Sequence, residues 1–133
     1  MNKLFGLAVG LMISGSAFAS QLDGSWNSIC YKEGNAFGQL HLSFNNEHGN
    51  GHVQRFNDSQ CRDQLSPPRE YFSFRYLEGR AHGEGVEIDV IGEDGVDFSI
   101  YRIEGSNLFL GSGAPQRSER PKVVDRDFYF VRQ

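Results

Sequence analysis

The sequence predicts an all-β protein, a small closed or nearly closed antiparallel up-and-down β-barrel of about eight strands. Short segments alternate apolar and polar residues, which is typical of strands with one buried face. Clusters of Gly, Asn, Asp and Pro separate these segments at hairpin length, and no segment after residue 20 has a helical period. A meander with one apolar face avoids exposed edges best by closing on itself.

The first 19 residues have the pattern of a secretory signal peptide. A short basic start, Met1-Asn2-Lys3, precedes an apolar run, and Ala17-Phe18-Ala19 is a small-x-small cleavage site. We therefore expect cleavage after Ala19 and a periplasmic or secreted protein. Residues 20–133 then form a single barrel domain.

Composition excludes some partners. Without residues 1–19 the chain carries 12 basic and 17 acidic side chains, a net charge of −5, which argues against nucleic-acid binding. No other stretch is apolar enough to span a bilayer. We expect a monomer with no cofactor.

The first predicted strand lies in the stretch 22–31 and holds the only Trp of the chain. Trp26, Ser28 and Cys30 share one face of this strand, and Gly24 lets the backbone bend into it. An indole buries up to about 250 Å², so we expect Trp26 to close one end of the barrel core.

The other strands follow from alternation and turn signals. Arg102 and Ile103 interrupt the alternation of their strand, which indicates a bulge. The predicted strands are 40–44, 51–56, 71–76, 86–90, 96–100, 108–110 and 127–131.

The two cysteines of the chain are Cys30 and Cys61. In an oxidising compartment the default is one disulfide between them, closing a loop of roughly 30 residues and contributing about 3–4 kcal/mol. A redox or metal pair is the alternative, but the spacing is far from C-x-x-C.

The chain resembles the lipocalin-like (calycin) barrels through Gly24-Ser25-Trp26, which is similar to their G-x-W at the start of the first strand. The resemblance implies a barrel fold and a basic residue covering the Trp ring, at Arg132 or, failing that, at Arg126. The layout also resembles small secreted bacterial barrels of this kind. The residues that carry that layout are Trp26, Cys30, Cys61, Ile88-Asp89, Arg120-Pro121 and Phe128-Tyr129-Phe130.

Aromatic residues are abundant, and a closed barrel must fill or line its interior. One set is expected to fill the core: Trp26, Phe44, Phe72, Phe74, Phe98 and Phe130. Tyrosines fall mostly on the opposite faces and are candidates for ligand binding or an exposed aromatic patch: Tyr31, Tyr71, Tyr76 and Tyr101, with Tyr129 beside them.

The sequence does not favour an enzyme. There is no G-x-S-x-G motif, and the cysteines are expected to be oxidised. Glu87, Asp89 and Asp97 are able to pair across strands for acid–base chemistry, but a solvated outer face is the favoured interpretation. We predict no metal site; the best candidates for one are His41, His48 and His52, which are more simply interpreted as surface histidines in a turn region.

The leading hypothesis is a non-enzymatic, lipocalin-like periplasmic or secreted barrel that binds a small apolar ligand or lipid fragment. The alternative is a protein-interaction module, such as a hydrolase inhibitor, that uses the polar loop 111–121 with Arg117 and Arg120 as contacts. The sequence names neither ligand nor partner.

Overall fold

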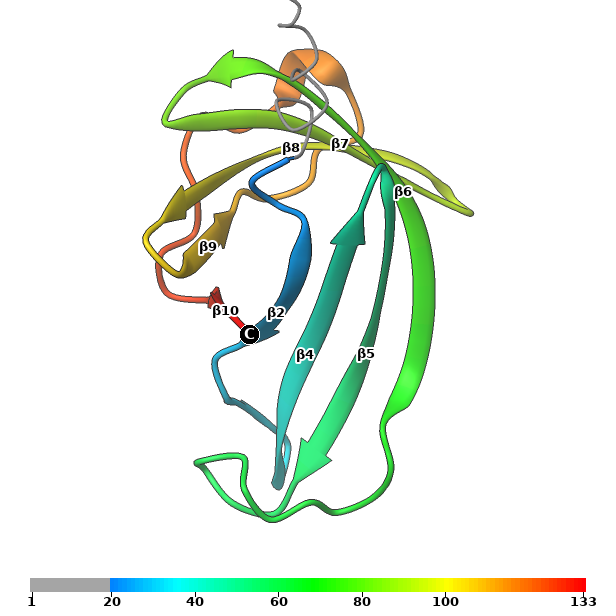
Figure 1. Cartoon of the computed structure of the whole chain (residues 1–133), viewed down its shortest axis with the longest axis vertical. Coiled ribbons are helices and arrows are strands. Elements are labelled where there is room, and N and C mark those ends of the chain that lie inside the picture. The colour runs from blue at the N-terminus through cyan, green and yellow to red at the C-terminus, as the bar shows by residue number, and fades with distance from the viewer. Residues whose placement is uncertain (1–19) are drawn as a thin grey trace, which may run out of the picture.

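A computed structural model describes residues 20–133, and the predicted signal peptide lies outside the described residues (Figure 1). The described part of the chain contains one short 3₁₀ helix, η1, at Arg117–Glu119. Its strands are β2 (Gly24–Ser28), β3 (Tyr31–Glu33), β4 (Ala36–Asn45), β5 (His48–Phe56), β6 (Arg69–His82), β7 (Gly85–Gly92), β8 (Gly95–Glu104), β9 (Asn107–Leu110) and β10 (Tyr129–Arg132).

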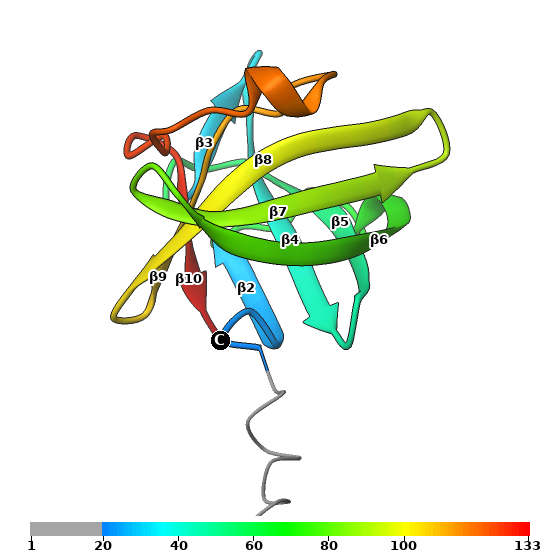
Figure 2. The same cartoon turned by 90° about the horizontal axis from the view of Figure 1, so that it is seen from above.

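Eight of these strands form a closed antiparallel barrel (Figure 2). From β4 to β10 each strand pairs with the next along the chain, β10 pairs with β2, and β2 closes the ring on β4. The extra strand β3 pairs with the first residues of β4, beyond the end of β2. The predicted all-β, up-and-down barrel is confirmed, and β3 is the strand that the sequence did not indicate.

Trp26 lies in the main core with no exposed surface. Its indole N–H donates to the carbonyl oxygen of Leu22 at 2.8 Å, so the segment before β2 folds back over the ring. The guanidinium carbon of Arg132 lies 4.1 Å from the ring centroid, a cation–π contact. Gly24 has φ +124°, and a Cβ there would lie 3.1 Å from Nη1 of Arg132, so a side chain would crowd that cover.

The predicted disulfide is confirmed. Cys30 and Cys61 are bonded, with their Cα atoms 5.8 Å apart and a sequence separation of 31. Cys30 follows β2, and Cys61 lies in the long connection between β5 and β6. The bond therefore holds that connection against the first strand.

Strand β8 faces the opposite way from the prediction. Its apolar alternation suggested that Phe98 and Ile100 point inward, but Tyr101 joins the main core with Trp26, whereas Ile100 belongs to a second cluster with Phe109 and Val124. The pairing of β8 with β7 and β9 runs without a register shift, so the predicted bulge at Arg102 is absent. Phe98 is thus not a core residue.

The chain between β9 and β10 covers the outer face of β8, which explains the reversed pattern. The backbones of Ala114 and Phe98 exchange two hydrogen bonds. The N–H of Ala114 donates to the carbonyl oxygen of Phe98 at 3.0 Å, and the N–H of Phe98 donates to that of Ala114 at 2.9 Å. The guanidinium carbons of Arg117 and Arg120 lie 5.3 and 5.4 Å from the Phe98 ring centroid. Val124 packs on Ile100. Both figures show η1 beside β8 (Figures 1 and 2).

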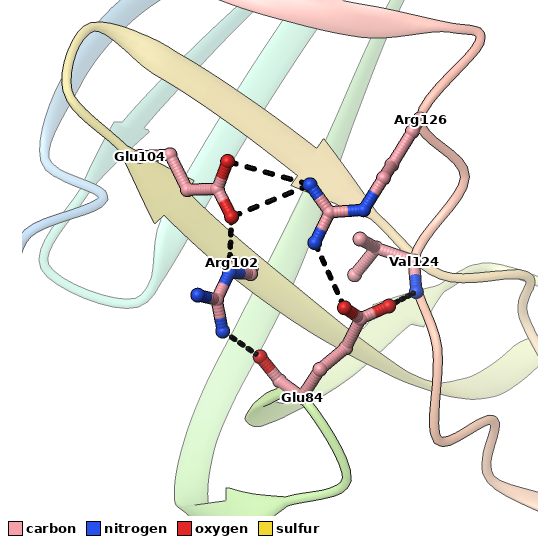
Figure 3. Close-up of polar contacts among 5 residues, drawn as sticks. All are labelled: Glu84, Arg102, Glu104, Val124 and Arg126. Carbon is pink, nitrogen blue, oxygen red and sulfur yellow. Dashed lines mark hydrogen bonds and ion pairs between the residues drawn. The ribbon is translucent and has the colours of Figure 1, made fainter.

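An exposed polar network fixes the far end of this covering segment (Figure 3). Arg126 binds Glu84 at 2.8 Å and both carboxylate oxygens of Glu104 at 3.3 Å. Glu84 also accepts from the backbone N–H of Val124 at 2.7 Å, and Arg102 donates to Glu104 and to the carbonyl oxygen of Glu84. These donors lower the pKa of Glu84 and of Glu104. Arg126 is therefore engaged here and not over Trp26.

Candidate functional site: an apolar cavity inside the barrel

The barrel interior contains a cavity of about 400 Å³, in the size range of small-molecule sites. Side chains from the inner faces of β4, β6, β7, β8 and β9 surround it, and most of them are apolar. The lining residues are Leu40, Leu42, Phe44, Phe72, Ser73, Phe74, Ile88, Val90, Gly92, Asp97, Ser99, Leu110, Gly111 and Gly113.

The cavity opens at the point along β6 where pairing with β5 ends and pairing with β7 begins. Residues 69–75 of β6 pair with β5, whereas residues 75–82 pair with β7. The first half of β6 therefore has no partner on its β7 side, and residues on both sides of this gap, including Phe72 and Gly92, line the cavity. Phe72 is 41% exposed, so it belongs to the mouth and not to the core, contrary to the prediction.

Glycines on β5 make room for the two rings at this mouth. A Cβ at Gly49 would collide with the ring of Phe74, and one at Gly51 would collide with the ring of Phe72. These two rings are stacked, with centroids 6.2 Å apart. The absence of β5 side chains lets both rings lie flat over that strand, so that they wall the cavity rather than fill it.

Two polar side chains of β8 face the cavity. Ser99 is buried, and its hydroxyl donates to the carbonyl oxygen of Gly111 at 2.8 Å. Asp97 is exposed, and a Cβ at Gly113 would lie 3.1 Å from its Cγ, so its carboxyl group lies against the backbone of that glycine. Asp97 forms no ion pair within residues 20–133. It is the single charged residue of the lining.

A second hollow of about 270 Å³ adjoins the first. The two share Leu40, Leu42, Leu110 and Gly111. Phe128, Phe130, Ser112 and Asp125 complete the second lining. Each of the two adjoining spaces is therefore mainly apolar and is lined by one acidic residue, Asp97 in the larger and Asp125 in the smaller.

The tyrosines predicted as ligand-binding candidates do not line this space. Tyr76 and Tyr101 are core residues that are 1% and 6% exposed, because both point inward. Burial raises the pKa of Tyr76 to about 12. Burial also raises the pKa of Tyr101, helped by the carboxylate of Glu78 that accepts from its hydroxyl. Neither belongs to an exposed patch.

The two other tyrosines lie outside the barrel interior. Tyr71 is 70% exposed and tilts against His52, with ring centroids 5.2 Å apart. Tyr31 packs edge-on against Phe128 at 5.6 Å. Burial raises the pKa of Tyr31. The two tyrosines contact different aromatic rings, and in the described part of the chain no aromatic contact joins them to each other.

The histidines are only partly brought together. His41 and His52 face each other across β4 and β5 with stacked rings 4.6 Å apart, and burial followed by the charge of His52 lowers the pKa of His41. His48 pairs with Asn45 and Arg75 instead. Within residues 20–133 no three His, Cys, Asp or Glu side chains are grouped so that they could hold a metal ion.

Arg120, predicted as an exposed loop contact, is buried with 3% of its side chain exposed. It donates to the carbonyl oxygen of Ser99 and to Asp89, each at 2.8 Å, and to the carbonyl oxygen of Ile88 at 3.3 Å. Its Nε lies 3.9 Å from Glu87. Glu87 and Asp89 do lie outside the barrel, but Arg120 partly covers them, so they are not a freely solvated face.

Sequence reasoning missed the residues that form the cavity. Leu40, Leu42 and Val90 were expected only as ordinary inward residues, and Asp97 as an outward one. The available signal was the spacing of small residues, with Gly49 and Gly51 alternating on one strand and Gly111 and Gly113 alternating beyond another. Small residues at every second position on an inner face leave a volume unfilled.

No family model, curated protein or solved structure matches this chain. The closed eight-stranded antiparallel barrel is consistent with a lipocalin-like fold. Within residues 20–133 no helix has the length and apolar character needed to cross a membrane. The disulfide fits a protein of an oxidising compartment, such as a secreted or periplasmic one.

Proposed function

We propose that the protein is a non-enzymatic, lipocalin-like binding protein of the periplasm or extracellular space that holds a small apolar ligand or lipid fragment inside its barrel. The observation that carries the proposal is the apolar cavity of about 400 Å³. Small-molecule sites are typically concave, largely apolar and about 300–1,000 Å³ in volume. The aromatic mouth formed by Phe72 and Phe74 gives such a ligand an entry lined by flat apolar surface.

The proposal is tested with a neutral apolar fluorescent probe, N-phenylnaphthylamine. Val90→Phe places a ring in the cavity, and we expect it to weaken probe binding about tenfold or more, because a filled cavity leaves no room for the ligand. Ile91→Phe is the matched control, since Ile91 is the next residue of β7 and points to the opposite face. No binding to the unaltered protein, or equal losses in both variants, would overturn the proposal.

Native mass spectrometry of the protein purified from its own host then identifies the natural ligand. We expect a fraction of the protein to carry a small molecule that organic extraction releases. Loss of that molecule in the Val90→Phe variant, but not in Ile91→Phe, would place it in the cavity.

A second candidate function is inhibition of a secreted hydrolase through the segment 111–121. The observation that favours it is the exposure of Arg117 on a segment that Arg120 anchors, because a rigid contact loses little entropy on binding. Arg117→Ala should abolish inhibition in a panel of hydrolases while leaving probe binding unchanged. If the unaltered protein inhibits none of them, this candidate is removed.

A further inference from the structure

We infer that the ligand of the cavity is a cationic amphiphile, an alkyl chain or ring system with an amine head, and that Asp97 binds the head. This inference rests on the proposed function and specifies its ligand class. The apolar character of the cavity does not specify the charge of a ligand's head group. That charge is inferred from the charged residues around the interior space.

The charged residues that line the cavity and the smaller hollow beside it are both acidic. Asp97 is the one charged residue of the larger cavity, and Asp125 is the one charged residue of the adjoining hollow. No Lys, Arg or His lines either space. An anionic head group inside either space, such as a carboxylate, would meet like charge, and unpaired charges of this kind are a usual means of rejecting a ligand. The basic residues His48 and Arg75 line a separate, more open hollow that shares Ser73, Phe74 and Gly92 with the cavity.

The two arginines of the covering segment, Arg117 and Arg120, are engaged on the outer side of β8. Arg120 is held by Asp89, by Glu87 and by two backbone carbonyl oxygens. Arg117 lies over the outward ring of Phe98. Neither residue belongs to the cavity lining, so neither supplies a charge to a head group inside.

The geometry favours Asp97 over Asp125 as the head-group partner. Asp97 lies on the same face of β8 as Ser99, two residues along the strand, so the carboxylate and the hydroxyl oxygen offer two acceptors to one ammonium. Asp125 already accepts the backbone N–H of Asp127 at 2.9 Å. The alkyl chain then runs inward from Asp97 toward Leu40, Leu42 and Leu110.

The test compares octylamine, octanol and octanoate by isothermal titration calorimetry near neutral pH. These probes share one chain and differ in head-group charge. We expect octylamine to bind most tightly and octanoate least. Asp97→Asn should weaken octylamine about fivefold, the upper effect of an exposed ion pair, and leave octanol unchanged. Asp94→Asn is the matched control, because it removes one acidic charge from the adjacent hairpin without touching the cavity lining.

The outcomes separate the two proposals. If octanoate binds as tightly as octylamine, or if Asp97→Asn leaves octylamine binding unchanged, the cationic class is wrong while the binding function stands. An equal loss in the Asp97 and Asp94 variants also overturns the role of Asp97, since only a diffuse charge effect would then remain. Failure of all three probes and of N-phenylnaphthylamine to bind overturns the binding function itself.

Discussion

Replacing Arg120 with Met should destabilise the barrel by about 3 kcal/mol. The guanidinium donates three hydrogen bonds from a buried position, to Ser99, Asp89 and Ile88, at 2.8, 2.8 and 3.3 Å. Breaking a buried ion pair by removing one partner costs about 3–5 kcal/mol. The side chain of Asp89 is 19% exposed, so water can reach its carboxylate after the substitution, which places the cost at the lower end of that range.

Equilibrium denaturation in urea measures this loss, and Arg117→Met is the matched control. Both arginines lie over the Phe98 ring at nearly the same distance, but Arg117 is exposed and its side chain makes no hydrogen bond or ion pair within residues 20–133. A surface change of this kind should cost about 0.5 kcal/mol or less. Arg120→Lys should fall between the two, because an ammonium keeps the charge but not the planar fork of donors.

Two results would refute this account of Arg120. One is a loss below about 1 kcal/mol, indistinguishable from that of Arg117→Met. The other is an unchanged rate of amide hydrogen exchange at Phe98 and Ala114, whose two backbone bonds hold the covering segment to β8 and should open more often without Arg120. A double-mutant cycle with Asp89→Asn isolates the pairwise energy, which we expect to be about 1–2 kcal/mol.

Three further predictions concern the stability of the barrel. Trp26→Ala should cost about 3–5 kcal/mol in urea denaturation, because the ring is fully buried; a loss below about 1 kcal/mol would contradict its central packing. Reduction of the Cys30–Cys61 disulfide should cost about 3–4 kcal/mol, measured as the difference in unfolding free energy with and without reductant, and no difference would exclude a stabilising role. Stability should fall between pH 10 and about 12, because the folded pKa of Tyr76 lies above its unfolded value and its contribution is lost as the phenol ionises. Tyr76→Phe should flatten this fall in the denaturation midpoint, and an equal slope in both proteins would contradict it.

The features that the sequence predicted depend on local patterns. Alternation and turn residues locate the strands because each strand must present one face to the core, whatever its partners are. Cys30 and Cys61 had only each other to pair with in an oxidising compartment. Trp26 was identified because a single large ring near the start of a small chain has few places to be buried.

The features that the sequence did not predict depend on contacts distant in the chain. Alternation shows which residues of β8 share a face, but it does not show which face points inward. The prediction took the apolar face to be the inward one. Phe98 and Ile100 in fact lie outside, because a segment that follows β9 covers them. Arg120 was expected in solvent because its partners, Asp89 and the backbone of Ser99, are at least 21 residues away.

The cavity and the covering segment have the same origin. Because Phe98 and Ile100 lie on the outer face of β8 under the covering segment, the inner face of β8 carries Asp97 and Ser99 at the level of the cavity. These side chains are smaller and more polar than those that a barrel needs to fill its interior. Gly111 and Gly113, beyond β9, leave further volume unfilled. A barrel that used its apolar β8 residues inside would have a filled interior and no need of the segment outside. The reversed strand therefore explains both why residues 111–127 are held so firmly and why an acidic group lines an otherwise apolar space.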